Sequence, residues 1–242
     1  MPDRAEFTPL ELTGRTRSHV VDLEQPRCTL HRDAVEPFLA LRAAAARAGI
    51  DLVPVSSFRD FRRQQLIWNG KCRGERELLD RNGQRVDPAT LDQGGLVSAI
   101  LLWSALPGAS RHHWGTDMDV IDATAVPAGG AVRLEPAEYS PGGRFSRLND
   151  WLDENAATFG FYRPYAVDLG GVHPEPWHLS YAPLAQQALA AFSLQVLEDA
   201  LDAEGIDALD AVRLRLPEIV DRYVMNVAAP PPMDAIPGTR RA

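Results

Sequence analysis

The chain has 242 residues, of which 45% are hydrophobic, and this is enough for one sizeable globular domain. Its formal net charge is −8, and so acidic a surface argues against a nucleic-acid partner or an anionic membrane. Two cysteines, Cys28 and Cys72, are too few for a disulfide scaffold or a four-cysteine zinc site. Two unpaired thiols in a reducing compartment are therefore the expectation, and one disulfide between them is the alternative.

The N-terminal residues contain no apolar stretch typical of a signal peptide, and no apolar run reaches the ~20 residues that span a bilayer. The expectation is a soluble protein without a membrane span, located in the cytoplasm. A periplasmic location is the alternative, should a signal sequence precede this chain. The oligomeric state cannot be predicted from the sequence.

The first elements in chain order are a helix, a strand and a second helix. An alanine-rich pattern predicts a helix over 33–48, with Asp33 as its N-cap and Gly49 as its stop signal. Residues 50–58 follow as a short strand-like run. Residues 59–69 again favour a helix, which we expect to end at Gly70.

The middle of the chain begins with a polar insertion at 71–95, predicted to form a surface hairpin around Asn82-Gly83. An apolar segment covers 96–106. The run DMDVID alternates polar and apolar residues, which indicates a half-buried strand. The remaining expectations are a loop at 124–147, a helix at 149–159, loop then strand up to residue 181, and helices from residue 183 onward.

This order predicts an α+β fold, with a central antiparallel sheet, flanking helices and a C-terminal helical extension. We expect a main domain at 1–183 and the extension at 184–229. The extension could cover a site, mediate a dimer or only add stability. The three prolines that begin at residue 230 predict a flexible tail over 230–242.

The stretch S-R-H-H-W-G-T-D-M-D, residues 110–119, carries the first candidate chemistry. Neighbouring residues of an extended chain point to opposite sides, so we expect only one of His112 and His113 to be a ligand. Strand alternation places Asp117 and Asp119 on one face. A histidine and a carboxylate from one loop–strand unit are plausible zinc ligands. A capping aspartate beside a surface histidine explains the same letters equally well.

The stretch H-P-E-P-W-H, residues 173–178, carries the second set of candidate catalytic residues. Pro176 forces Glu175 toward extended or polyproline geometry, which has three residues per turn. Glu175 and His178 then fall on one edge, so a free carboxylate stands beside a ligand. The two stretches combine as His112, Asp119 and His178 on a zinc ion, with Glu175 as the general base for a water molecule.

A third stretch, S-S-F-R-D, places Arg59 where the strand-like run ends and a helix begins. An arginine in such a position can bind a carboxylate through two parallel hydrogen bonds. Gln64 lies five residues further along the same helix. The nearby Arg62 and Arg63 are interpreted as a solvated basic face.

Together the three stretches resemble the VanY-type D-alanyl-D-alanine carboxypeptidases, zinc peptidases that share a metal-site scaffold with hedgehog and with lysostaphin-type enzymes. The family pattern S-x-H-x-x-G-x-A-x-D corresponds to Ser110, His112, Gly115 and Asp119, with Asp117 in place of the small residue. E-x-W-H corresponds to residues 175–178, and S-G-Y-R-S-x-x-x-Q to residues 56–64. The resemblance covers about residues 30–183.

The resemblance implies a fold like that of hedgehog and the D,D-peptidases, a bound Zn²⁺, and the same ligand and base residues as above. It also implies that Arg59, with help from Gln64 and Ser110, holds the free C-terminal carboxylate of a peptidoglycan peptide. Asp117 could then be a rival ligand, a partner of a ligand or an exposed side chain. His113 and Trp114 fill variable positions and are expected to line the pocket.

The function that the resemblance implies is zinc-dependent removal of a C-terminal D-alanine from peptidoglycan stem peptides, a D,D-carboxypeptidase activity. An L,D-carboxypeptidase acting on tetrapeptides in recycling is the closest alternative. A non-catalytic zinc-containing peptidoglycan-binding module is a third possibility. The presence of Glu175 speaks against the third, because a binding module does not need a base.

Overall fold

The computed structural model describes residues 7–202 and 205–230. Two antiparallel sheets form its framework. The smaller sheet is a hairpin, and the larger one has four strands in the order β3-β4-β6-β5. The strands are β1 (Val20–Glu24), β2 (Arg27–His31), β3 (Leu52–Ser56), β4 (Asp117–Asp122), β5 (Phe161–Tyr162) and β6 (His178–Tyr181).

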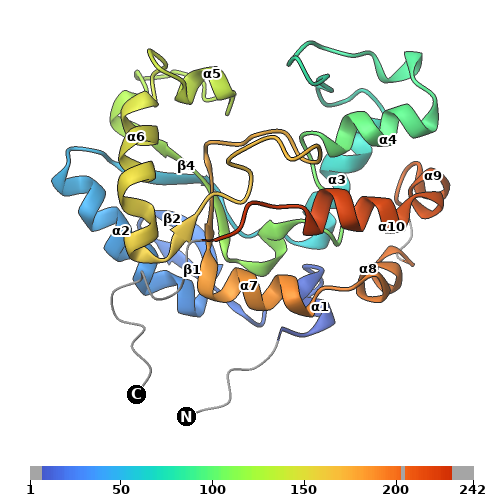
Figure 1. Cartoon of the computed structure of the whole chain (residues 1–242), viewed down its shortest axis with the longest axis horizontal. Coiled ribbons are helices and arrows are strands. Elements are labelled where there is room, and N and C mark those ends of the chain that lie inside the picture. The colour runs from blue at the N-terminus through green and yellow to red at the C-terminus, as the bar shows by residue number, and fades with distance from the viewer. Residues whose placement is uncertain (1–6, 203–204, 231–242) are drawn as a thin grey trace.

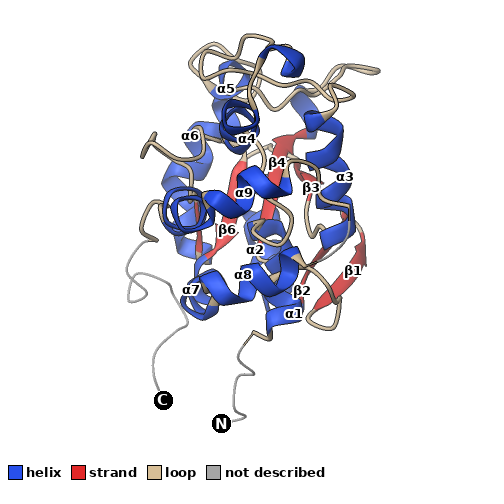
Figure 2. Ribbon diagram, turned by 90° about the vertical axis from the view of Figure 1, so that its right-hand side faces the viewer, coloured by secondary structure: helices blue, strands red, loops and turns tan. Residues whose placement is uncertain are grey.

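Helices surround the four-stranded sheet (Figures 1 and 2). The α-helices are α1 (Pro9–Leu12), α2 (Val35–Arg47), α3 (Phe61–Cys72), α4 (Gln93–Leu101), α5 (Pro136–Tyr139), α6 (Ser146–Asn155), α7 (Ala182–Ala191), α8 (Leu194–Leu201), α9 (Leu209–Leu214) and α10 (Leu216–Ile219). Shorter 3₁₀ turns are η1 (Arg32–Ala34), η2 (Pro88–Thr90), η3 (Arg111–Trp114), η4 (Ala123–Ala125) and η5 (Ala156–Phe159), and η6 (Val220–Met225) is a π-helix. The α+β class with a central antiparallel sheet is confirmed.

Two hydrophobic clusters hold these layers together. One packs α2 and α6 against the apolar face of β4 and β6, with Phe38, Leu152 and Met118 among its members. The other unites α3, α4 and α7 with the C-terminal helices, and it includes Trp68 and Leu197. In Figure 1, α2 and α6 lie on one side of the sheet, and α3, α4 and α10 lie on the other. The helical extension therefore shares its core with α3 and α4.

Several expectations about single elements need correction. Asp33 does not cap α2: it lies inside η1, whose N-cap is His31, and the N-cap of α2 is Ala34. The second helix does not end at Gly70 but continues to Cys72, because a helical glycine costs only about 1 kcal/mol relative to alanine. Strand β4 is buried along all six residues rather than half-buried, because both faces of the sheet are covered.

The helices at 149–159 and from residue 183 also differ from the expectation. Helix α6 begins three residues earlier and passes into η5. The apolar run that follows residue 183 breaks into α7 and α8, because Ser193 is extended and its hydroxyl accepts a hydrogen bond from the Val196 amide. Apart from Pro230, the tail expected at 230–242 lies outside the described residues.

The insertion behaves as its turn residues predict. Leu79 and Arg85 form a β-bridge, and Gly83 has φ +73° at the turn between them. The β1–β2 hairpin, by contrast, was absent from the sequence-based expectation. Both cysteines are free thiols, as expected. Among the described helices, none combines the length and the apolar character that crossing a membrane requires.

Candidate metal centre and substrate pocket

The register of β4 against β6 creates the site. Asp119 pairs with His178, and Asp117 pairs with Ser180. Because side chains alternate along a strand, these four polar residues share one face of the sheet, while Met118 and its neighbours face the apolar cluster. A buried polar face of this kind is costly unless its groups find partners. The arrangement thus calls for a histidine, a cation or a metal ion to face the two aspartates.

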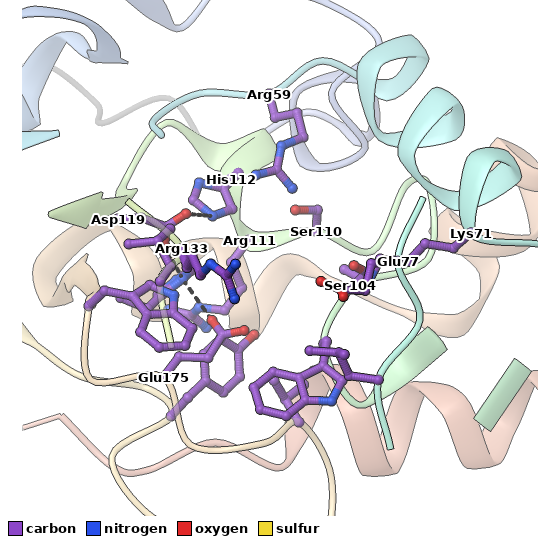
Figure 3. Close-up of a pocket in the computed structure, with 18 residues that line it drawn as sticks. Arg59, Lys71, Glu77, Ser104, Ser110, Arg111, His112, Asp119, Arg133 and Glu175 are labelled. Atoms are coloured by element: carbon purple, nitrogen blue, oxygen red, sulfur yellow. Dashed lines mark ion pairs between the residues drawn. The ribbon is translucent and has the colours of Figure 1, made fainter. Parts of the chain in front are cut away.

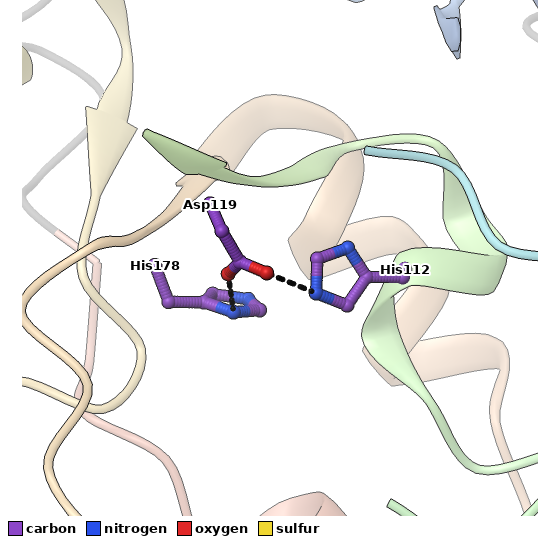
Figure 4. Close-up of side chains that lie close together, drawn as sticks. All are labelled: His112, Asp119 and His178. Atoms are coloured by element: carbon purple, nitrogen blue, oxygen red, sulfur yellow. Dashed lines mark ion pairs between the residues drawn. The ribbon is translucent and has the colours of Figure 1, made fainter. Parts of the chain in front are cut away.

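The turn η3 supplies His112 to this face. Its ring Nδ1 lies 2.9 Å from the carbonyl oxygen of Ser57, to which it can only donate. Nε2 therefore carries the free lone pair, and it lies 3.4 Å from Asp119 Oδ2 (Figure 4). Gly115 ends the turn with φ +69°, a conformation that glycine adopts readily.

His178 is oriented in the opposite sense. Its Nε2 lies 2.9 Å from Asp117 Oδ1, and its Nδ1 lies 3.1 Å from Asp119 Oδ1. One ligand atom from each of His112, Asp119 and His178 falls within 4.8 Å of the other two. Asp119 Oδ1 and His178 Nδ1 are buried without a hydrogen-bond partner of adequate geometry. Two orphaned buried acceptors beside a third lone pair fit a cation at their centre.

The electrostatics of the cluster agree with this. Burial opposes ionisation of Asp119, but His112 and His178 outweigh it and hold the pKa of its carboxyl below the ordinary value. Burial also disfavours a charged His178, yet the carboxylates of Asp117, Asp119 and Glu175, as acceptors for its ring N–H groups, raise its pKa well above the ordinary value. Three carboxylates around one imidazole thus favour a positive charge at this point of the site.

Asp117 takes the second of the three roles left open for it, as the partner of a ligand. It is fully buried and faces the nitrogen of His178 that points away from the cluster. Arg111 donates to it from Nε at 2.8 Å, and also donates to Ser180 and Tyr162. Because the Arg111–Asp117 pair is buried, each charge requires the other. Carboxylate–histidine pairs of this kind orient metal ligands in many proteins.

Glu175 stands at the edge of the cluster, as the extended geometry before Pro176 predicts. Its Oε2 lies 3.3 Å from His178 Nδ1, and its side chain retains 13% exposure. It faces a pocket of about 280 Å³. The pocket (Figure 3) is lined by Arg59, Lys71, Glu77, Leu79, Trp103, Ser104, Ala105, Ser110, Arg111, His112, Asp119, Arg133, Leu134, Tyr165, Val172, Glu175, Trp177 and His178.

Arg59 reaches the same pocket from the loop before α3. Its guanidinium donates to Gln64 Oε1 at 2.7 Å and to Ser56 Oγ at 3.0 Å, which leaves other N–H groups unused. Gln64 is fully buried and also donates to the carbonyl of Ala105, so it supports Arg59 and does not itself line the pocket. Ser110 does line it, beside Arg59.

His113 and Trp114 do not line the pocket, contrary to the expectation for them. Both are fully buried on the other side of η3. His113 Nδ1 donates to the carbonyl of Arg59, and its Nε2 accepts from the Gly108 amide. Burial lowers the pKa of His113 to about 3, so the ring stays neutral and holds the Arg59 loop against η3.

Sequence reasoning missed much of the pocket wall, including Tyr165, Trp103 and Lys71. Tyr165 packs edge-on against the ring of His178, with centroids 5.0 Å apart, and burial raises the pKa of its hydroxyl, which therefore keeps its proton. Trp103 stacks on His173 at 4.1 Å. Lys71 lies in the last turn of α3. Of these three, only Lys71 left a signal in the sequence, as the single lysine of the chain at the first residue of the predicted insertion.

The fold and the site define a class of protein: an α+β protein with a buried His–Asp–His cluster, a carboxylate beside it and an arginine across the pocket. Within that class the chain belongs to the VanY family, described as D-alanyl-D-alanine carboxypeptidase, whose model matches residues 27–184. This match spans more than half of the chain.

Individual relatives and structures give the following similarities. An uncharacterized Haemophilus influenzae protein is 39% identical over 122 residues, covering 50% of this chain and 93% of its own length. A D-alanyl-D-alanine carboxypeptidase of Enterococcus faecalis is 28% identical over 174 residues, covering 70% of this chain and 55% of its own. The solved structure of VanYB in complex with D-alanine-D-alanine has 22% identity and a TM-score of 0.48, over 77% of this chain and 89% of that one.

Proposed function

We propose that this protein is a zinc-dependent carboxypeptidase that removes the C-terminal D-alanine of peptidoglycan stem peptides, as a D,D-carboxypeptidase. The observation that carries the proposal is one pocket that contains the His–Asp–His cluster, Glu175 and Arg59 together. Family membership supports the reaction class. The substrate follows from the family description and from an arginine suited to a free carboxylate.

Zinc is the metal that we assign to the cluster. Two imidazoles and one carboxylate are typical of catalytic zinc sites, which keep a position open for water or substrate. A zinc ion held by His112, Asp119 and His178 would lower the pKa of water and polarise the scissile carbonyl. Both histidines present their lone pairs to the cluster, because their other ring nitrogens face Ser57 and Asp117.

The remaining steps belong to the side chains of the pocket. Arg59 pairs with the C-terminal carboxylate of the peptide and fixes the last peptide bond over the cluster. Glu175 accepts a proton from the attacking water and returns it to the leaving amine. The hydroxyl of Tyr165, which keeps its proton, is a donor for the oxygen of the scissile carbonyl.

The first experiment incubates the zinc-loaded protein, with and without a chelator, with three peptides. These are a pentapeptide ending in D-Ala-D-Ala, the same pentapeptide amidated at its C-terminus, and the matching tetrapeptide. We expect chelator-sensitive loss of one alanine from the free pentapeptide alone, measured by mass spectrometry. Loss from the tetrapeptide instead would make the enzyme an L,D-carboxypeptidase. No loss from any peptide, with zinc bound, would refute the proposal.

A further inference from the structure

Lys71 is the only lysine of the chain, although the chain has 25 lysine and arginine residues in total. The other residues of this set are arginines. Most of the arginines on the surface form ion pairs or face solvent. Lys71 instead extends from the last turn of α3 into the pocket that holds the metal cluster (Figure 3). A single compact ammonium group in this position differs in chemistry from the planar, forked donor of arginine.

The ammonium group of Lys71 has no hydrogen bond and no ion pair within 4 Å among the residues that the structure describes. Burial lowers its pKa, while the charges of Glu175 and Glu77 favour its protonated form. Arg59, in contrast, is already held by Gln64 and Ser56. A partly desolvated cation without a contact partner gains more from a ligand carboxylate than a solvated surface lysine does.

Glu77 and Ser104 lie beside Lys71 on the same wall, across the pocket from the metal cluster (Figure 3). Glu77 pairs with Arg85 on its outer side, and its side chain is 48% exposed. In the described part of the chain it forms no ion pair with Lys71. The wall thus presents an ammonium group, a carboxylate and a hydroxyl that are near one another and not in mutual contact.

This combination suits a zwitterion better than a single carboxylate. A lone ligand carboxylate bound by Lys71 would be repelled by Glu77, whereas an α-amino acid group supplies a carboxylate to Lys71 and an ammonium group to Glu77. The C-terminal carboxylate already has its partner in Arg59, which lies with Ser110 on another part of the wall (Figure 3). The group recognised here is therefore a second one, carried by a side chain of the substrate.

We propose that Lys71, Glu77 and Ser104 form a subsite for a zwitterionic amino-acid group at the end of a substrate side chain. Diaminopimelate carries such a group, and lysine at the same position of a stem peptide carries only an ammonium group. The inference rests on the proposed function and refines it: the substrate is a diaminopimelate-type stem peptide, with this residue on the acyl side of the cleaved bond.

The test compares two stem peptides that differ only at this residue, diaminopimelate or lysine, and a third with the diaminopimelate side-chain carboxyl amidated. The enzyme forms are the zinc-loaded wild type and Lys71→Met. Arg62→Met is the matched control, because Arg62 is an exposed cation of the same helix that does not line the pocket. We expect the wild type and the control to favour free diaminopimelate about 10- to 100-fold in kcat/KM. Lys71→Met should lose most of this preference.

Equal turnover of the peptides by the wild type, or an unchanged preference in Lys71→Met, would overturn the subsite while leaving the proposed function intact. An equal loss on all peptides in Lys71→Met would do the same, since Lys71 would then serve the common C-terminal carboxylate. A binding measurement does not depend on turnover. We therefore also measure, by calorimetry, the affinity of the same peptides for Glu175→Gln and for Glu175→Gln/Lys71→Met. If the protein turns over no peptide but still binds the diaminopimelate peptide more tightly, and this preference is lost with Lys71→Met, the subsite stands although the proposed function has failed. If it neither turns over a peptide nor shows a binding preference that depends on Lys71, both the subsite and the proposed function are refuted.

Discussion

At the scale of single residues, Glu175 is the side chain on which the proposed reaction depends most directly. It stands next to the cluster without being one of the three grouped ligand residues. We expect Glu175→Gln to keep its zinc but to lose about 10²- to 10⁴-fold in kcat, because the amide cannot accept the proton of the attacking water. Zinc content by atomic absorption and single-peptide kinetics check this. Glu154→Gln, which removes an exposed carboxylate of α6, is the control; normal turnover in Glu175→Gln would assign the base elsewhere.

We expect Asp117 to affect stability and metal binding through different neighbours. Asp117→Ala leaves the buried charge of Arg111 without its partner, which costs about 3–5 kcal/mol of unfolding free energy. It also removes the acceptor for His178 Nε2, and metal affinity should fall about 10- to 100-fold.

The double variant Asp117→Ala/Arg111→Met separates the two effects. We expect it to recover most of the unfolding free energy, because no buried charge remains unpaired, while zinc affinity stays weak. Denaturant titrations and a competition assay with a zinc-binding dye measure both quantities. Recovery of zinc affinity together with stability would mean that Asp117 affects the metal only by way of folding.

The sequence predicted the cluster better than its surroundings for a physical reason. The spacing of His112 to Asp119 and of Glu175 to His178 is local, and strand alternation or a proline determines which way these side chains point. The support of Arg111 for Asp117 arises only when β4 and β6 pair, so it was not visible in the spacing. His113 was assigned to the pocket wrongly, because η3 is a turn whose inner side faces Arg59 and Gly108.

At the scale of elements, the junction of η3 with the β1–β2 hairpin sets the position of His112. Gly115 has φ +69°, and a Cβ there would lie 2.5 Å from Val20 Cγ1 and 2.7 Å from the His31 backbone nitrogen. Gly83 has a similar φ of +73°, but a Cβ there would meet nothing within 4 Å. The two positions therefore separate backbone strain from steric conflict.

We expect Gly83→Ala to cost about 1–2 kcal/mol of unfolding free energy, the price of the left-handed conformation alone. Gly115→Ala should cost at least twice as much and should weaken zinc binding, because the hairpin must move away from η3. Denaturant unfolding and zinc titration of both variants test this. Equal costs at the two positions would show that the hairpin accommodates a methyl group easily.

Element boundaries were predicted where a strong local signal stood and not elsewhere. Strand β3, strand β4 and the turn at Gly83 follow from alternation and turn residues. The end of α3 and the start of α2 depend on tertiary neighbours: Gly70 packs near Arg76, and His31 caps η1 from the hairpin. Strand β1 is half-buried or exposed at every position and lacks a hydrophobic alternation strong enough to predict the hairpin.

At the scale of the whole molecule, the cluster joins segments that are far apart in the chain. His112 comes from η3, Asp119 from β4 and His178 from β6, so an ion bound to all three stabilises only the folded chain. We expect a chelator to lower the melting temperature, with a loss of about 2.7 kcal/mol if zinc had been present at 100 times its Kd.

The matched variants for this prediction are His112→Ala and His173→Ala. His112→Ala should melt at the same temperature with and without the chelator, because a ligand is missing. His173→Ala should respond as the wild type does, since His173 stacks on Trp103 outside the cluster. Calorimetric melting curves give the comparison. A chelator effect that persists in His112→Ala would place the stabilising ion elsewhere.

The dependence of stability on pH provides a second whole-molecule test, through a histidine that is not part of the cluster. Burial lowers the pKa of His31 to about 4; among its charged neighbours, Asp33 and Glu11 favour its proton while His19 and Arg32 oppose it. An unfolded histidine has a pKa of about 6.5, so between pH 6.5 and 4 the unfolded chain binds more protons than the folded one. His31 therefore has no destabilising effect above pH 6.5. Its titration lowers the free energy of unfolding by about 3 kcal/mol as the pH falls from 6.5 to 4.

The substitution His31→Asn isolates this contribution, because asparagine keeps an acceptor for the Asp33 amide that the His31 ring now caps. Unfolding free energies of both proteins are measured in chelator from pH 7.5 to 4.5, and their difference cancels the titration of His178 and of the aspartates. We expect the wild type to lose stability relative to His31→Asn by up to about 1.4 kcal/mol per pH unit below pH 6.5. A difference that stays constant over this range would show that His31 titrates normally in the folded protein, and that the hairpin leaves its ring open to water.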